Sequence, residues 1–320
     1  MSILFGDYRI SLDQSEEGAT LNFVSHAHSD HIGGVKKNRK VICSDITRDL
    51  VMARLGHAVN YIDPPEGIDL VNSGHMLGSK QLCVDLDSGE RVVYTGDYQV
   101  QESAVAEKIE IPKSDVLIMD STYPFPNVTF DERDEVVTSI QHYISSKSEV
   151  GCILFGAYSM GKGQEIVNIC NDIGVVPAVD KSIAIINGVY VKYGINLQYT
   201  VSDFESKVDD GNFSNQVWIV SMNRMNFVRK LVAEAGKRIF TAVATGFSMT
   251  RKFDTDVQFS LSDHADFKQA LYYIEESGPR RIYTRGGMAE TFAKNLRAEG
   301  YRASPLLGKQ SVLDAAVNHP

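Results

Sequence analysis

One short stretch near the N-terminus constrains this chain more than any other part of the sequence. It reads Ser25-His26-Ala27-His28-Ser29-Asp30-His31 and contains three imidazoles and a carboxylate. Only 8 of the 320 residues are histidine, so this spacing rarely arises by chance. Imidazole nitrogen and carboxylate oxygen are ligands of zinc and similar metals. The stretch predicts a metal site in which His26 and His28 share one ion, while Asp30 and His31 face a neighbouring one.

The surroundings of this motif indicate a loop that leaves the end of a strand. Residues 19–24 alternate apolar and polar side chains and include β-branched and aromatic ones, which predicts a strand. Gly33 and Gly34 follow the motif and predict a turn. Ligands on such a loop are held by rigid structure and stay open to substrate. The opposing interpretation is a polar surface loop in which the histidines coincide.

Two later residues are candidates for completing the metal site. His75 lies in a glycine-flanked turn at residues 73–79, and Asp97 follows a buried-looking strand at residues 91–95. Taken alone, a single histidine or a strand-end aspartate is more often structural. Placed after the histidine-rich motif and in this order, they predict a third histidine for the first ion and a carboxylate that bridges two ions.

With these residues in this order, the chain resembles the metallo-β-lactamase superfamily. Three further stretches narrow the resemblance to the β-CASP nucleases. Residues 116–123 resemble the acidic motif A, with Asp120; residues 261–267 closely resemble motif B, with His264; residues 155–165 are similar to the strand, turn and helix that open the cap domain. The likeness covers nearly the whole chain and is to the short group of mRNA 3′-end-processing-factor-like and ligase-associated exonucleases.

The resemblance implies an α/β fold: a metallo-β-lactamase αββα sandwich with an inserted parallel α/β cap. The sandwich would comprise residues 1–125 and 256–320, and the cap residues 126–255. The residues agree with this division. A rigid Pro-Phe-Pro-Asn break occupies residues 124–127, and after it predicted strands alternate with helices. The predicted cap elements are strands at residues 152–155, 217–220 and 239–244 and a helix at residues 164–173.

The resemblance also implies a role for each site residue. One zinc ion would be held by His26, His28, His75 and Asp97, and a second by Asp30, His31 and the shared Asp97. His264 would be the general acid, positioned by Asp120, and Asp30 is counted with these two as catalytic. Asp13, after an early strand, would orient a ligand histidine; a turn aspartate is the structural alternative.

Two residues near the cap are weaker candidates for binding substrate, Lys162 and Ser262. Lys162 follows a glycine loop and opens a predicted helix, where backbone N–H groups favour an anion such as a phosphate. The spacing from Gly156 to Lys162 is that of a nucleotide-binding P-loop, but Gly163 stands where that loop needs a serine or threonine hydroxyl. ATP binding is therefore not expected. A purely structural turn is the other interpretation.

One position departs from the family pattern. Motif C is a histidine in most relatives, and Arg285 stands there in this chain. A guanidinium is always charged and cannot ligate a cation. The second zinc would therefore lose its fourth protein ligand, and we expect fewer than two tightly held ions. Arg285 is also a candidate for contacting a substrate phosphate. The remaining alternative is that its side chain points to solvent.

Composition mostly excludes other classes of protein. The net charge of −9 shows no general basic footprint for nucleic acid, although a local groove could form from Lys36-Lys37, Arg39-Lys40 and Arg251-Lys252. Those pairs could equally be solvated surface. No apolar run approaches the roughly 18 residues of a membrane span. With no visible signal peptide and four scattered cysteines, a cytoplasmic protein with reduced thiols and no membrane contact is expected.

Three functions are consistent with the sequence. The favoured one is a metal-dependent nuclease acting on single-stranded nucleic acid, with RNA preferred and DNA as the other substrate. The second is a degenerate relative that binds RNA or a protein partner without cutting, which Arg285 supports. The third is a small-molecule hydrolase of glyoxalase or lactonase type, which the cap and His264 oppose. The sequence leaves open a homodimer, nucleic-acid-processing partners, and endonuclease against exonuclease action.

Overall fold

The computed structural model describes residues 2–35, 39–202, 204, 216–236 and 238–306. Lys36 and Lys37, named above for a basic groove, lie outside the described residues. The chain divides into two compact units. The first comprises Met1–Glu102, Ala106–Thr129 and the chain from His264 onward; the second comprises Ser103–Val105 and Phe130–Asp263. Within the described residues, every helix falls short of the length and apolar content that a bilayer crossing needs.

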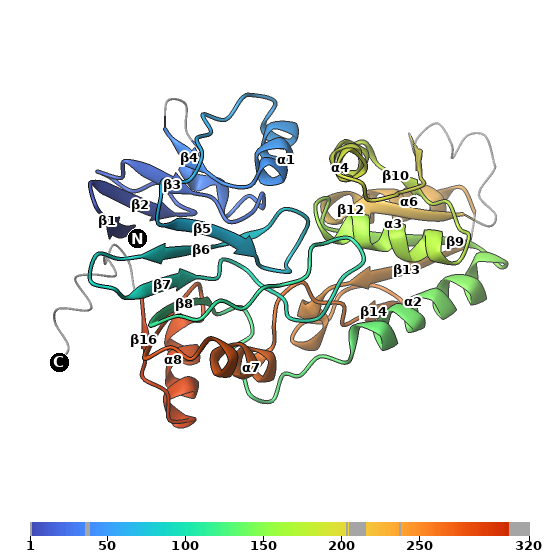
Figure 1. The fold of residues 1–320 in the computed structure, drawn as a ribbon. Coiled ribbons are helices and arrows are strands. Elements are labelled where there is room, and N and C mark those ends of the chain that lie inside the picture. The colour runs from blue at the N-terminus through green and yellow to red at the C-terminus, as the bar shows by residue number, and fades with distance from the viewer. Residues whose placement is uncertain (1, 36–38, 203, 205–215, 237, 307–320) are drawn as a thin grey trace. The chain divides into compact units, whose positions relative to one another are not determined.

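The first unit is built on two sheets (Figure 1). One has four strands in the order β1-β2-β3-β4: β1 Ser2–Phe5, β2 Tyr8–Leu12, β3 Leu21–Phe23 and β4 Val41–Ile42. The other has six strands in the order β16-β15-β8-β7-β6-β5: β5 Ile68–Asn72, β6 Lys80–Asp85, β7 Arg91–Tyr94, β8 Val116–Asp120, β15 Arg281–Arg285 and β16 Ala303–Pro305. The pairs β1–β2, β5–β6 and β6–β7 are antiparallel, and the other pairs in these two sheets are parallel.

Apolar side chains fill the space between these sheets. Ile10, Leu12 and Phe23 from the smaller sheet pack in one buried cluster with Leu82 and Ile118 from the larger sheet. Successive strand residues point to opposite faces, so the alternate residues of the larger sheet form a second core on its other face. There they pack against helices α7, Phe267–Ser277, and α8, Ala289–Ala298 (Figure 1). This is the expected sandwich.

Helix α1, Asp45–Leu55, was not predicted from the sequence. Both of its ends carry ordinary helix signals. The Ser44 hydroxyl accepts a hydrogen bond from the backbone N–H of Thr47, and Gly56 ends the helix in the left-handed conformation with φ of 70°. A short 3₁₀ turn, Ile32–Gly34, follows the histidine-rich motif, where the two glycines predicted a turn.

The second unit is an α/β domain on one six-stranded parallel sheet (Figure 1). The strand order is β11-β10-β12-β9-β13-β14: β9 Cys152–Ala157, β10 Ala178–Val179, β11 Thr200–Val201, β12 Val217–Ser221, β13 Ile239–Ala244 and β14 Val257–Phe259. Its α-helices are α2 Arg133–Ser148, α3 Lys162–Asp172, α4 Lys181–Lys192 and α6 Met225–Glu234. Two 3₁₀ turns, Met222–Arg224 and Gly246–Met249, complete the described elements.

The predicted cap architecture is confirmed, since strands and helices alternate and every strand pair of the sheet is parallel. The apolar side of α6 packs with Leu154 and Trp218 in a buried cluster. The predicted end of the cap at residue 255 lies too early in the chain. Strand β14 follows that residue, and it pairs with β13 as the last strand of the cap sheet.

Candidate metal centre

The predicted ligands sit at one edge of the sandwich because of strand direction. The loop Ser25–His31 follows β3, His75 follows β5, and Asp97 follows β7. Strands β5 and β7 are each antiparallel to β6 and therefore run in the same direction. Their carboxyl ends meet at the same edge of the sheet, as does the end of β8 at Asp120.

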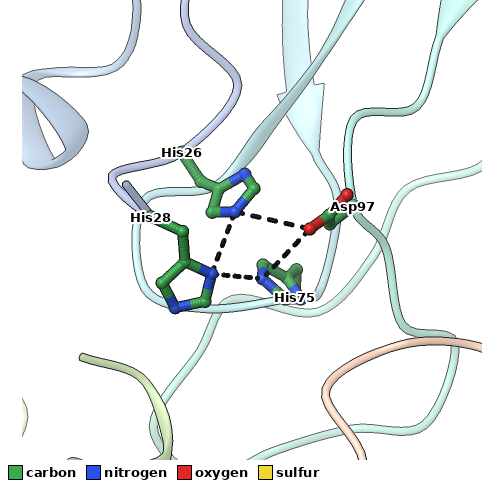
Figure 2. Close-up of side chains that lie close together, drawn as sticks. All are labelled: His26, His28, His75 and Asp97. Atoms are coloured by element: carbon green, nitrogen blue, oxygen red, sulfur yellow. Dashed lines mark hydrogen bonds and ion pairs between the residues drawn. The ribbon is translucent and has the colours of Figure 1, made fainter. Parts of the chain in front are cut away.

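Four of these side chains converge on one point (Figure 2). Nε2 of His26 lies 3.0 Å from Nδ1 of His28, and Nε2 of His75 lies 3.1 Å from the same atom. Oδ2 of Asp97 is 3.5 Å from Nε2 of His26 and 3.8 Å from Nε2 of His75. Ligands about 2.0–2.1 Å from a tetrahedral zinc ion stand roughly 3.3 Å apart. The donor types and separations therefore fit a zinc-sized ion.

Two glycines make this packing geometrically feasible. Gly96, just before Asp97, has φ of 56°, and a Cβ there would lie 2.6 Å from Cβ of Ser25. Gly74, just before His75, has φ of 74°, and a Cβ there would lie 2.2 Å from the carbonyl oxygen of Gln99. Any larger residue would push the loops apart. The Gly-His and Gly-Asp pairs in the sequence are thus part of the site.

A second group of side chains lies beside the first and shares Asp97. Nε2 of His31 is 3.3 Å from Oδ2 of Asp97 and 3.8 Å from Oδ2 of Asp30. The Asp30 side chain is 79% exposed, so it lies at the open rim of the site. These residues are the set predicted for a second ion. They offer three candidate protein ligands.

Asp13 is the centre of a buried hydrogen-bond network behind the ligands. Its Oδ2 lies 2.9 Å from Nδ1 of His31, and its Oδ1 accepts a hydrogen bond of 2.7 Å from the backbone N–H of Ser25. Tyr94 donates its hydroxyl proton to Oδ2 at 2.6 Å. Asp13 also has φ of 58°, which is the left-handed region that aspartate tolerates better than most residues. Its position fits the predicted orientation of a ligand histidine.

The charges of the site favour a cation. Burial, with positive charge on His31 and His75, holds the pKa of His26 well below its usual value, so its imidazole is neutral. Burial opposes charge on His31, but the carboxylates of Asp97 and Asp13 raise the pKa of His31 well above its usual value. Burial likewise opposes charge on Asp97, yet His31 and His264 hold the pKa of that carboxyl well below its usual range. A cation would replace the proton on His31.

His264 and Asp120 form the predicted pair next to the ligands. Nδ1 of His264 lies 3.1 Å from Oδ2 of Asp120 and 3.9 Å from Oδ2 of Asp97. Thr122 donates a hydrogen bond of 2.9 Å to the other Asp120 oxygen. The side-chain amide of Gln99 donates to the backbone carbonyl of His264 at 2.8 Å, which ties the motif B loop to the segment after Asp97.

Arg285 does not point to solvent. Its side chain is 16% exposed, and Nη2 donates a hydrogen bond of 2.8 Å to the carbonyl of Leu12. Nη1 donates to the hydroxyl of Tyr94 and lies 3.7 Å from Oδ2 of Asp13. With both terminal nitrogens engaged inside the first unit, the guanidinium is not placed for the predicted contact with a substrate phosphate.

Lys162 and Ser262 belong to the second unit, where a buried ion-pair network includes both. The Lys162 side chain is 3% exposed, and its Nζ donates hydrogen bonds of 2.7 Å to Glu165 and 2.6 Å to Asp263. Arg133 pairs with Glu165 and donates to the carbonyl of Ser262 at 2.9 Å. A lysine already held by two carboxylates has little capacity to bind a phosphate. The structural interpretation of this turn fits better than the predicted phosphate contact.

Comparison with known proteins finds several relatives of this chain. No family model matches the chain. A probable DNA ligase of Opitutus terrae is 28% identical over 312 residues, which is 92% of this chain and 29% of the ligase. An uncharacterized protein in the lig 3′ region of Acidianus ambivalens is 32% identical over 143 residues, 44% of this chain and 99% of that protein. The 5′ exonuclease Apollo of Gallus gallus is 26% identical over 179 residues, 52% of this chain and 39% of Apollo.

The fold, the order of the candidate ligands along the chain and these relatives all indicate the same protein family. The chain belongs to the β-CASP branch of the metallo-β-lactamase superfamily. It spans less than half the length of the ligase and of Apollo. Membership of the β-CASP branch accounts for the inserted parallel cap and for the pairing of His264 with Asp120.

Two residues of this β-CASP site were not predicted as functional, Ser25 and Tyr94. The Ser25 hydroxyl lies 3.0 Å from Nδ1 of His26 and donates to Asp13 at 2.9 Å. Tyr94 joins Asp13 to Arg285. Ser25 stands directly before the first ligand, and Tyr94 stands three residues before Asp97. Their positions close to the motif residues were visible in the sequence, whereas their partners, Asp13 and Arg285, become neighbours only on folding.

Proposed function

We propose that this protein is a zinc-dependent nuclease that hydrolyses phosphodiester bonds of single-stranded nucleic acid. The observation that carries the proposal is the adjacency of two groups. Three histidines and Asp97 converge on one point, and the His264–Asp120 pair lies beside the same Asp97 carboxylate. A binding protein has no need for a partly buried histidine–carboxylate pair next to a metal-ligand set.

The residues divide the chemistry between them. When bound, a zinc ion at His26, His28, His75 and Asp97 would acidify a water molecule and offset negative charge on the phosphate. His264, with Nδ1 directed at Asp120, is oriented to donate a proton from Nε2 to the leaving oxygen of the substrate. The Asp120 carboxylate stabilises the positive charge of His264 before that donation. Asp13 fixes the ring of His31 through its Nδ1.

Both RNA and DNA remain candidate substrates, with RNA favoured from the sequence. The relatives include a protein named as a 5′ exonuclease and one named as a probable DNA ligase, and these names belong to much longer proteins. A cytoplasmic location, a homodimer and partner proteins are further proposals that follow from the sequence.

The test uses single-stranded RNA and DNA oligonucleotides of the same sequence, labelled at either end. The protein is stripped with a chelator and reloaded with zinc. Zinc-dependent cutting supports the proposal, and the pattern of labelled products gives the polarity. Tight binding of the oligonucleotide without cutting, in the zinc-loaded protein, would favour the degenerate binding homologue. Hydrolysis of thioesters or lactones without nuclease activity would favour the small-molecule hydrolase.

A further inference from the structure

Arg285 stands at the end of β15, directly opposite Asp120 in the register with β8. Its guanidinium carbon lies 5.1 Å from the centre of the Tyr94 ring, and its nitrogens contact Tyr94, Leu12 and Asp13. All these residues belong to the first unit. The guanidinium is therefore fixed in one place by partners on two different segments, the end of β2 with Asp13 and the end of β7.

Two short contacts connect this charge with the ligands of the second ion position. Nη1 of Arg285 lies 3.7 Å from Oδ2 of Asp13, and that same oxygen lies 2.9 Å from Nδ1 of His31. The other nitrogen of His31 faces Asp97 and Asp30. The positive charge thus stands directly behind the carboxylate that supports His31 as a ligand.

We propose that Arg285 acts as a fixed internal cation that weakens binding of an ion at Asp30, His31 and Asp97. The proposal rests on the metal dependence of the proposed function and adds an unequal role for its two ion positions. One ion is held tightly by His26, His28, His75 and Asp97. The second position exchanges its ion readily, and the guanidinium supplies part of the positive charge there.

Arg285 has two opposing effects on the affinity of the second ion position. Their relative sizes decide whether Arg285 strengthens or weakens binding of the ion there. The guanidinium could help the second ion by holding Asp13 in place, or weaken its binding by neutralising Asp13 and repelling the ion. The 3.7 Å contact with Asp13 is too long for a hydrogen bond. Asp13 keeps hydrogen bonds of 2.7 and 2.9 Å from Ser25 and 2.6 Å from Tyr94 without Arg285.

Ser25 and Tyr94 can hold Asp13 in place without Arg285, but neither supplies the positive charge of the guanidinium. A guanidinium keeps its charge at every accessible pH, and charges in a partly buried site interact several times more strongly than in water. A histidine at this position would add a ligand, whereas Arg285 adds like charge. The electrostatic effect therefore exceeds the positional one, and removing the charge should tighten the second position.

The experiment is a zinc titration of the full chain after chelation, with a chromophoric competitor that resolves two dissociation constants. Arg285→Met removes the charge and keeps the length. The Leu12 carbonyl still accepts a hydrogen bond of 2.7 Å from the Gln14 N–H in that variant. Arg285→Gln is a second neutral variant with polar atoms, for use if the methionine variant does not fold. Arg285→Lys keeps the charge.

Arg281→Met is the matched control. It removes a like charge from the same strand, where Arg281 pairs with Glu90 at 2.7 Å. We expect Arg285→Met to tighten the second zinc at least about tenfold with the first unchanged. Arg285→Lys and Arg281→Met should both bind the second zinc with an affinity close to that of the parent protein.

Three outcomes would overturn the inference. They are equal affinity of the parent for two zinc ions, no tightening in either neutral variant, and equal tightening in Arg285→Lys. Because the readout is metal affinity, it does not depend on nuclease activity. A parent that binds no zinc at either position would instead overturn the metal dependence of the proposed function.

Discussion

Nδ1 of His264 lies 3.1 Å from Oδ2 of Asp120, although the two residues are 144 positions apart in the chain. The contact fixes the orientation of the His264 ring. It also places a negative charge where an imidazolium needs one. The proposed proton donor is therefore prepared before any substrate arrives.

His264→Ala should retain zinc and lower the turnover of oligonucleotide cleavage about 10²–10⁴-fold, because it removes the proton donor and leaves all four ligands of the first ion. Asp120→Asn should lose a similar factor, and the double variant should lose little more, since the pair acts as a unit. Single-turnover cleavage and elemental analysis measure both properties. His142→Ala, an exposed histidine on α2, is the control. Unchanged cleavage by both variants would remove His264 from the mechanism.

His26→Ala or His75→Ala should remove most of the bound metal, because each deletes one of four converging ligands. His57→Ala, an exposed histidine of the same unit, should leave the metal content unchanged. Elemental analysis after dialysis against limiting zinc measures the effect. Full metal content in both ligand variants would place the ion elsewhere.

Asp13→Asn should weaken metal binding about 10–100-fold, the usual effect of losing a carboxylate that supports a ligand histidine. Asparagine tolerates the left-handed backbone of Asp13, so the change tests the charge and not the turn. Zinc titration gives the affinity, and circular dichroism checks the fold. An unchanged affinity would show that Asp13 serves only to close the turn.

Lys162→Met should destabilise the second unit by about 1–3 kcal/mol, because it removes one of the two cations that pair with Glu165 and Asp263 and leaves Arg133 as the other. Urea unfolding provides the measurement. Lys181→Met, an exposed lysine at the start of α4, should change stability by less than about 0.5 kcal/mol. A stable Lys162 variant with weaker oligonucleotide binding would restore the phosphate contact predicted from the sequence.

Asp180 should give the second unit an acid-sensitive component of stability. Burial opposes its charge, but hydrogen bonds from Ser182, Ser221 and the N–H of Ile183 hold the pKa of Asp180 below the usual 3.8. The folded state therefore binds this proton less readily than the unfolded state. The contribution is complete above about pH 4 and is lost as the pH falls through 3.8 toward the lower folded value.

Asp180→Ala should accordingly lower the free energy of unfolding of the second unit by about 1–2 kcal/mol near neutral pH. The loss should be smaller at low pH. Urea unfolding of parent and variant between pH 3 and pH 7 would show the two stabilities converging in acid. If the difference in stability between parent and variant stays constant across this pH range, the destabilisation comes from lost packing and not from the charge of Asp180.

The sequence predicted which side chains gather at the candidate site, the strand ends that carry them and the parallel cap, because each depends on local spacing and periodicity. His26, His28 and Asp97 follow strands whose direction sets a common edge. The partners of Arg285 and Lys162 could not be predicted from local spacing or periodicity. Arg285 contacts residues more than 190 positions earlier, and Lys162 meets an aspartate 101 positions later. Such contacts depend on how distant segments pack, which no local pattern encodes.

The insertion of the cap determines the order in which the sandwich can form during synthesis. Strand β15 lies between β8 and β16, so the larger sheet is incomplete until the chain has passed the entire cap. The hydroxyl of Ser121, just after β8, donates to the carbonyl of Arg285, 164 positions later. A nascent chain that ends within the cap exposes the edge of β8, which is a template for non-native pairing. Early folding of the cap would bring its two ends together and shorten the loop that β15 must close.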